Sequence, residues 1–312
     1  MTYNYEIRIE GGPKNQGSIE FSRLAQLAES IYEIAKGALQ IRLEGVSKKR
    51  GESPRYLQDA VQIRLKGLRA GSTVLMIESD TIGEHLPQLQ GDLFHPDTLK
   101  ALPAQTPMQL VVASFEEALR TEPQEVSHLD KPLLRQMQAL KKFFEQEKEV
   151  LSIANEGGFE TLQLKAVDFA RIRELEEITP DPRPMLISGQ VDMLKYSKSL
   201  VTILTPEGVI RARVDERLPA EQIGRHWGKT GTFAGTAHFR PDGKLSIFEI
   251  QQVVEVPENA AIYLSQVPEL TTVEEQMDRF MKKNNGRTNR LKDLLGQWPG
   301  DESYDEIIAE IQ

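Results

Sequence analysis

The segment "TYNYEIRIE" (Thr2–Glu10) alternates apolar and polar side chains without a break. Tyr3, Tyr5, Ile7 and Ile9 occupy every second position, so in an extended strand they all lie on one face. The pattern predicts a strand that has one buried face and needs a second layer to cover it.

That second layer is predicted by the segment that follows. From about Ser22 the apolar period changes from two to between three and four, which indicates a long amphipathic helix. The runs "AVQIRLKGL" (60–68) and "STVLMIES" (72–79) then favour two strands joined by a hairpin-sized turn. A strand, a long helix and a hairpin predict an α+β domain over residues 1–105, with the helix laid across a small sheet.

Residues 106–180 are predicted to be a mainly helical region. One of its helices, roughly 131–147, begins with Asp130 in the capping position, and a hairpin around Gly157 follows it. The sequence therefore predicts a separate helical region that contains one hairpin.

A proline-rich break, "TPDPRP" (179–184), precedes a change to short β-rich runs. Five such runs, divided by turns such as "PEG" (206–208), predict a small antiparallel β-barrel of the OB or SH3 kind over residues 181–258. The segment "LPAEQIGRHW" (218–227) predicts a short helix between the third and fourth strands. Residues 259–312 are predicted to form a helical tail.

The composition is that of a folded protein, with 39% hydrophobic and 27% charged residues among 312. The net charge of −9 argues against a protein that coats nucleic acid, although a local basic face is compatible with an acidic total. The absence of cysteine excludes disulfides and thiolate metal sites. Neither a secretory signal pattern nor an apolar run of about 18 residues is present, so we expect a cytoplasmic protein with no membrane partner.

No catalytic motif stands out. The five histidines form no HExxH pair and no cluster with carboxylates along the sequence. The segment "GRHWGKTGTF" (224–233) contains the Gly-Lys-Thr end of a phosphate-binding loop, but it lacks the glycine five residues earlier, and a strand-like stretch follows it. We therefore expect a turn into a barrel strand at this point, and a protein that is not an enzyme and has no cofactor or metal.

Basic residues gather in two clusters, residues 48–56 and residues 279–292. Cations of this kind bind phosphates in a salt-dependent way that does not depend on base sequence. The alternative interpretation is a solvated loop and a solvated helix face. The candidate nucleic-acid contacts are Lys48, Lys49, Arg50, Lys282 and Lys283. The barrel is a further candidate surface, because OB folds stack bases on aromatic side chains. Its predicted strands contain few aromatic residues: Tyr196, Phe233, Phe239 and Phe248.

The C-terminal segment separates its charges. Residues 279–292 carry six positive charges and no negative one, whereas residues 293–312 carry six negative charges and no positive one. An apolar series runs through both segments, and helices this short are marginal alone in water. The pattern favours a segment that folds against a surface, which is either a partner protein or the rest of its own chain.

The stretch "LLGQWPGDES" (294–303), followed by an acidic, isoleucine-rich helix, resembles the tail of small bacterial antitoxins that partner PIN-domain ribonuclease toxins. In such antitoxins a C-terminal segment wraps the toxin and blocks its acidic, metal-binding active site, often by inserting an arginine. The resemblance therefore implies that Arg287 or Arg290 enters a carboxylate cluster of the toxin, where a guanidinium pairs with two oxygens at once.

The partner-binding residues that this resemblance implies are Arg287, Arg290, Leu291, Leu294, Leu295, Trp298, Pro299, Gly300, Asp301, Glu302, Tyr304, Ile307, Ile308 and Ile311. The chain departs from these antitoxins in being several times longer and in having no obvious small DNA-binding module at its N-terminus. The remainder, including "GLRAGSTVLMIE" and "GTFAGTAHFRPDGKLSIFEI", is similar to uncharacterised bacterial proteins.

The main hypothesis from the sequence is thus a non-catalytic binding protein that neutralises a toxin-like nuclease through its tail. One alternative is a nucleic-acid-binding adaptor that uses the barrel and the basic clusters. Another is a structural subunit of a bacterial assembly, a homo-oligomer whose protomers are held together by the tail.

Overall fold

The computed structural model describes residues 1–11, 18–48, 55–69, 73–86, 101–155, 162–195, 199–215, 217–257, 261 and 263–268. The chain divides into two units, Met1–Leu270 and Thr271–Gln312. All described residues belong to the first unit, so the predicted helical tail lies almost entirely outside them. None of the helices in the described ranges combines the length and hydropathy needed to cross a membrane.

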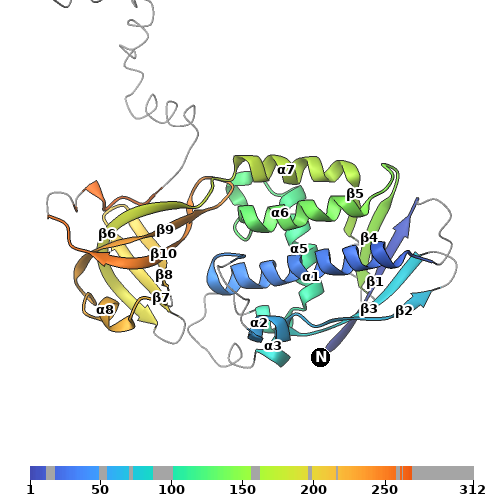
Figure 1. The fold of residues 1–312 in the computed structure, drawn as a ribbon, viewed down its shortest axis with the longest axis horizontal. Helices are drawn as coiled ribbons and strands as arrows, with labels where there is room; N and C mark the ends of the chain where they lie inside the picture. The colour runs from blue at the N-terminus through green and yellow to red at the C-terminus, as the bar shows by residue number, and fades with distance from the viewer. Residues whose placement is uncertain are drawn as a thin grey trace, which may run out of the picture. The chain divides into compact units, whose positions relative to one another are not determined.

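The first part of the chain contains a five-stranded sheet in which every neighbouring pair is antiparallel. The strand order is β2 (Ile63–Arg69), β3 (Thr73–Asp80), β1 (Thr2–Glu10), β4 (Val150–Asn155) and β5 (Leu162–Lys165). The alternation in "TYNYEIRIE" correctly predicts a strand with one buried face, because Tyr5, Ile7 and Ile9 are all buried. This strand lies at the centre of the sheet (Figure 1).

Helices pack with one another and with the apolar face of this sheet in one core (Figure 1). They are α1 (Phe21–Glu44), α2 (Arg55–Ala60), α3 (Ile82–His85), α5 (Pro107–Arg120), α6 (Lys131–Ala139) and α7 (Phe169–Ile178). Short 3₁₀ turns occur at Leu102–Ala104, Pro123–Glu125, Leu140–Phe143 and Ala166–Asp168. The long helix predicted after Ser22 is confirmed as α1.

The helix predicted over roughly 131–147 is shorter than expected. Asp130 does cap it, because its carboxylate accepts a hydrogen bond from the Leu133 N–H at 3.0 Å. The α-helix ends at Ala139, however, and continues only as a 3₁₀ turn. The tighter turn buries Phe143 before the chain enters β4, so apolar residues continue beyond the end of the α-helix and make the predicted helix too long.

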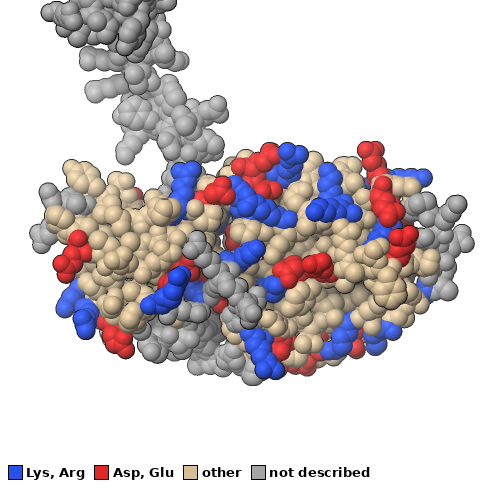
Figure 2. Space-filling view, in the orientation of Figure 1, with Lys and Arg blue, Asp and Glu red and all other residues tan. Residues whose placement is uncertain are grey.

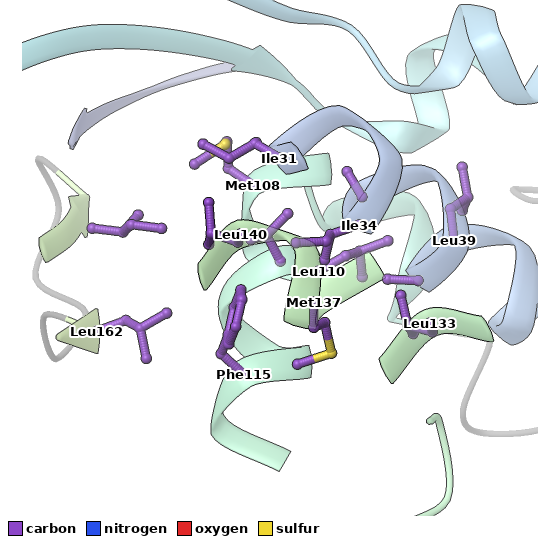
Figure 3. Close-up of a cluster of buried hydrophobic side chains, with 14 of the residues drawn as sticks. Ile31, Ile34, Leu39, Met108, Leu110, Phe115, Leu133, Met137, Leu140 and Leu162 are labelled. Atoms are coloured by element: carbon purple, nitrogen blue, oxygen red, sulfur yellow. The ribbon is translucent and has the colours of Figure 1, made fainter. Parts of the chain in front are cut away.

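One core joins the two segments that the sequence analysis separated at residue 105. Figure 3 shows side chains of α1, α5, α6 and β5 directed toward one another, among them Ile34, Leu110, Met137 and Leu162. The predicted hairpin in region 106–180 adds β4 and β5 to the N-terminal sheet. Residues 1–105 and 106–180 therefore form one sheet and one core, because β1 pairs with a strand that lies far along the chain.

The second part is a closed five-stranded barrel with its own core. It consists of β6 (Arg183–Lys195), β7 (Leu200–Thr205), β8 (Gly208–Val214), β9 (Thr230–Phe239) and β10 (Leu245–Val254), with α8 (Ala220–Gly224) between β8 and β9. The five predicted strands and the short helix are confirmed.

The sequence predicted a purely antiparallel barrel, but one pair of strands in the observed barrel is parallel. The ring runs β10-β8-β7-β6-β9 and closes between β9 and β10. Four of its pairings are antiparallel, but β10 runs parallel to β8, with Phe248 opposite Ala212. A hairpin-by-hairpin interpretation cannot reveal this pairing, since α8 and β9 separate the two strands along the chain.

Candidate functional site

The predicted partner-binding residues lie outside the described residues. This applies to all positions from Arg287 to Ile311 that the antitoxin resemblance implied, and also to Lys49, Arg50, Lys282 and Lys283. Lys48 is described, and its side chain is exposed. The structure therefore leaves these assignments as predictions.

The cations on the N-terminal hairpin, which follow the first basic cluster, are paired with carboxylates. Arg64 of β2 lies 2.8 Å from Asp80 of β3 and 3.5 Å from Glu78, and Lys66 lies 3.5 Å from Glu78. Arg69 lies 2.8 Å from Glu6 of β1. Because each cation already has a carboxylate partner, this edge of the sheet offers little free positive charge to a phosphate.

Asp80 is the centre of a small polar cluster beside this hairpin. Its carboxylate accepts a hydrogen bond from the Thr2 hydroxyl at 2.7 Å, and this bond together with the Arg64 guanidinium holds the pKa of Asp80 below its usual range. Folding also brings in Glu84 and His85, so that one ligand atom from each of the three lies within 4.8 Å of the others.

Histidines and carboxylates do not cluster along the sequence, but folding brings Asp80, Glu84 and His85 together. Glu84 and His85 follow Asp80, the last residue of β3, by four and five residues, and this spacing was the signal in the sequence for the cluster. The carboxylate of Asp80 is already engaged by Thr2 and Arg64, so the arrangement acts as an ion-pair network around a guanidinium.

A cavity of about 190 Å³ lies between α5 and the strands β1 and β4. Tyr5, Gln109 and Asn155 contribute to its lining. The Tyr5 hydroxyl is 2.6 Å from the Thr106 hydroxyl, and burial raises the pKa of Tyr5, so the phenol stays protonated. The cavity is smaller than the roughly 300–1,000 Å³ of most small-molecule sites.

The aromatic residues that the sequence placed on the predicted barrel strands do not form a stacking surface. Phe233, Phe239 and Phe248 are all buried in the barrel core, with 2% or less of each side chain exposed. Tyr196 lies outside the described residues. A base cannot reach the three buried rings, so they stabilise the barrel by packing.

An exposed tryptophan occurs instead in the turn between α8 and β9. Trp227 is 66% exposed, although its ring nitrogen donates a hydrogen bond to the backbone carbonyl of Asp192 at 3.1 Å. The turn is tied to β6 by two backbone hydrogen bonds. The Gly228 N–H donates to the Val191 carbonyl at 2.8 Å, and the Val191 N–H donates to the Lys229 carbonyl at 3.2 Å. The segment "GRHWGKTGTF" is thus a turn into a barrel strand, as the sequence predicted.

The charges on the face shown in Figure 2 are interspersed, with acidic and basic side chains alternating over the surface. The net charge of −9 is therefore not gathered into one acidic surface on this face. Such a surface is compatible with small local binding sites of either sign.

No protein-family model matches this chain, and neither a curated protein nor a solved structure matches it.

Proposed function

We propose that the chain is a non-catalytic binding protein that neutralises a PIN-type nuclease in the cytoplasm through its C-terminal segment. The observation that carries the proposal is the sharp change of charge within one apolar series, from six cations in residues 279–292 to six carboxylates in residues 293–312. The division of the chain after Leu270 supports a separate role for this segment.

In this proposal the two charged blocks have different tasks. Arg287 or Arg290 enters the carboxylate cluster of the nuclease, where it competes with the catalytic metal. Trp298 and the isoleucines of the final helix lie in an apolar groove of the partner and supply most of the binding free energy.

The test is inhibition of a PIN-domain ribonuclease whose gene neighbours the gene of this chain. The double variant Trp298→Ala, Ile308→Asp should abolish both complex formation and inhibition. Tyr263→Ala, which removes an exposed aromatic side chain outside residues 271–312, serves as the matched control and should inhibit normally. An unchanged affinity of the double variant would show that the segment does not bind the nuclease.

A second candidate function is binding of single-stranded nucleic acid by the barrel. Numbered within the barrel, the strands follow the order 1-2-3-5-4, the third and fifth run parallel, and a helix lies between the third and fourth. We infer from this topology that the barrel is of the OB kind, a fold that often binds oligonucleotides. The inference to function rests on analogy of fold.

Fluorescence anisotropy with labelled single strands and with a duplex tests this candidate. Binding should weaken steeply between about 50 and 200 mM salt, because phosphate contacts release counterions. Absence of binding to any single strand at the low end of that range would exclude the function.

A further inference from the structure

We propose that Trp227, Arg225 and Lys229 form a stacking site for one base of a single-stranded nucleic acid. The inference rests on the second candidate function and identifies the residues that would perform it. These three residues belong to the turn between α8 and β9, which the sequence analysis singled out only as a false phosphate-binding loop.

The Trp227 ring is exposed and is nevertheless held in place. Two-thirds of Trp227 is exposed, whereas the barrel phenylalanines are buried. The hydrogen bond from its ring nitrogen to the Asp192 carbonyl fixes one edge of the indole. A ring fixed in this way loses little conformational entropy when a base stacks on it, which is the condition for a good stacking platform.

The backbone around the ring is equally constrained. The side chain of Gln190 donates a hydrogen bond to the Gly228 carbonyl at 3.2 Å, in addition to the two backbone bonds between the turn and Val191. Gly228 has φ = 70°, which is the left-handed region where glycine is favoured, so the sharp turn after Trp227 is built into the sequence. The platform is thus part of the barrel framework.

Two exposed cations lie close to Trp227 along the chain. Arg225 and Lys229 flank the tryptophan, both are exposed, and within the described residues neither forms an ion pair. Glu221 lies four residues before Arg225, but within the described residues the two side chains form no ion pair. These cations differ from Arg64 and Lys66, whose charges are matched by carboxylates. Exposed cations two residues before and two residues after an exposed aromatic ring suit a ligand that carries phosphates next to flat bases.

The ligand that this chemistry selects is single-stranded, because a base within a duplex presents no free face to a ring on the protein surface. Stacking on an aromatic ring is tolerant of base identity because every base has a flat π-face, so we expect little preference among bases. An exposed tryptophan flanked by cations is also found at protein interfaces, and the experiment separates that outcome from ours.

The experiment uses the full chain with Trp298→Phe, so that Trp227 is the only tryptophan present. Addition of an oligothymidylate of about 15 nucleotides should quench the Trp227 emission, with a midpoint that matches fluorescence anisotropy of the labelled strand. In the natural background, Trp227→Ala should weaken binding about 5- to 150-fold, and Trp227→Phe should retain part of the affinity. Tyr263→Ala, another exposed aromatic, should bind normally.

The results separate the two levels of the proposal. Nucleic-acid binding that is unaffected by Trp227→Ala would overturn the stacking site and leave the candidate function standing. Absence of binding by the unsubstituted chain would overturn both, and the exposed ring would then be assigned to a protein interface. Trp227→Phe keeps an aromatic ring, although it loses the hydrogen bond to the Asp192 carbonyl, so equal loss in the Phe and Ala variants with unchanged thermal unfolding would also contradict stacking.

Discussion

Arg23 of α1 and Glu149, the residue before β4, form an ion pair of 2.7 Å in which both side chains are more than nine-tenths buried. The guanidinium also lies 4.3 Å from the centroid of the Phe143 ring, and the Glu145 N–H donates to the Glu149 carboxylate at 2.9 Å. The pair therefore connects the first turn of the long helix to the segment that leads into the sheet.

Removal of one partner should be strongly destabilising. Arg23→Met leaves a buried carboxylate without its counter-ion, and we expect a loss of about 3–5 kcal/mol in the free energy of unfolding, measured by urea denaturation. Within the part of the chain that the structure describes, the second oxygen of Glu149 accepts no hydrogen bond, so the carboxylate is incompletely satisfied there.

The double variant Arg23→Met, Glu149→Leu should consequently recover much of that loss, since it replaces both charges with apolar groups. If the double variant is as unstable as the sum of the two single variants, the pair is not coupled and its residues act through packing alone.

The lowered pKa of Glu117 in α5 should make the stability of the protein depend on pH. Burial tends to raise its pKa, but the His128 imidazole 3.7 Å away and hydrogen bonds from the Ser127 and His128 N–H groups outweigh burial and hold the pKa below the ordinary 4.5. A carboxyl with a lowered pKa in the folded state contributes stability above its unfolded pKa, and this contribution is lost as pH falls through the folded pKa.

The expected result for Glu117→Gln is a loss of about 1–2 kcal/mol at pH 7, because hydrogen bonds to a charged acceptor are stronger than those to an amide. The difference between variant and unsubstituted chain should shrink below pH 4.5, the ordinary value of the group, as its carboxyl becomes protonated. Chemical denaturation at several pH values measures this difference in the free energy of unfolding. A difference that stays constant down to the acid range would contradict the lowered pKa.

Gly235 of β9 should be intolerant of any side chain. A Cβ at this position would lie 2.1 Å from the carbonyl oxygen of Glu249 on the adjacent strand β10. We expect Gly235→Ala to cost about 1–3 kcal/mol or more, because backbone cannot move aside as a flexible side chain does. Gly224→Ala, where the Cβ meets no atom within 4 Å, is the matched control. Equal thermal stability of both variants would refute the close approach of β9 and β10.

Neutralising the cations of the α8–β9 turn should change the salt dependence of oligonucleotide binding, whereas neutralising the cations of the N-terminal hairpin should not. Arg225→Gln with Lys229→Gln should reduce the salt dependence of oligonucleotide binding by about 1.4 in the log–log slope, at about 0.7 per phosphate contact on a single strand. Arg64→Gln with Lys66→Gln should leave that slope unchanged, since these side chains are already paired with Glu78 and Asp80. Equal effects of the two pairs would mean that binding follows overall charge rather than the turn.

The elements that the sequence predicted well are those with local signals. The period of two in β1, the "PEG" turn between β7 and β8, and the short helix α8 are each encoded within about a dozen residues. The pairing of β1 with β4, which places Tyr5 opposite Asn155, depends on residues that are distant along the chain. No periodicity in either segment reports such a pairing, so the sequence alone does not show that the sheet continues past residue 105.

The candidate sites show the same limit. Arg64 and Lys66 are basic residues in the sequence, but only the structure shows that Glu78 lies opposite Arg64 in the strand register and 3.5 Å from Lys66. Likewise, "GRHWGKTGTF" gave the turn, whereas the exposure of Trp227 depends on where the barrel holds that turn. The main functional hypothesis depends on residues 279–312, which lie outside the described residues, so their binding role remains a prediction from the sequence.

The central position of β1 has a consequence for synthesis on the ribosome. The strand β1 (Thr2–Glu10) leaves the ribosome before both of its partners, which are β3 and β4, and the last residue of β4 is Asn155. One edge of β1 therefore stays open while more than a hundred further residues are made, and closing so long a loop is slow. A nascent chain shorter than this exposes an apolar strand edge, so we expect the early stages of translation to be the period in which this protein most needs a chaperone.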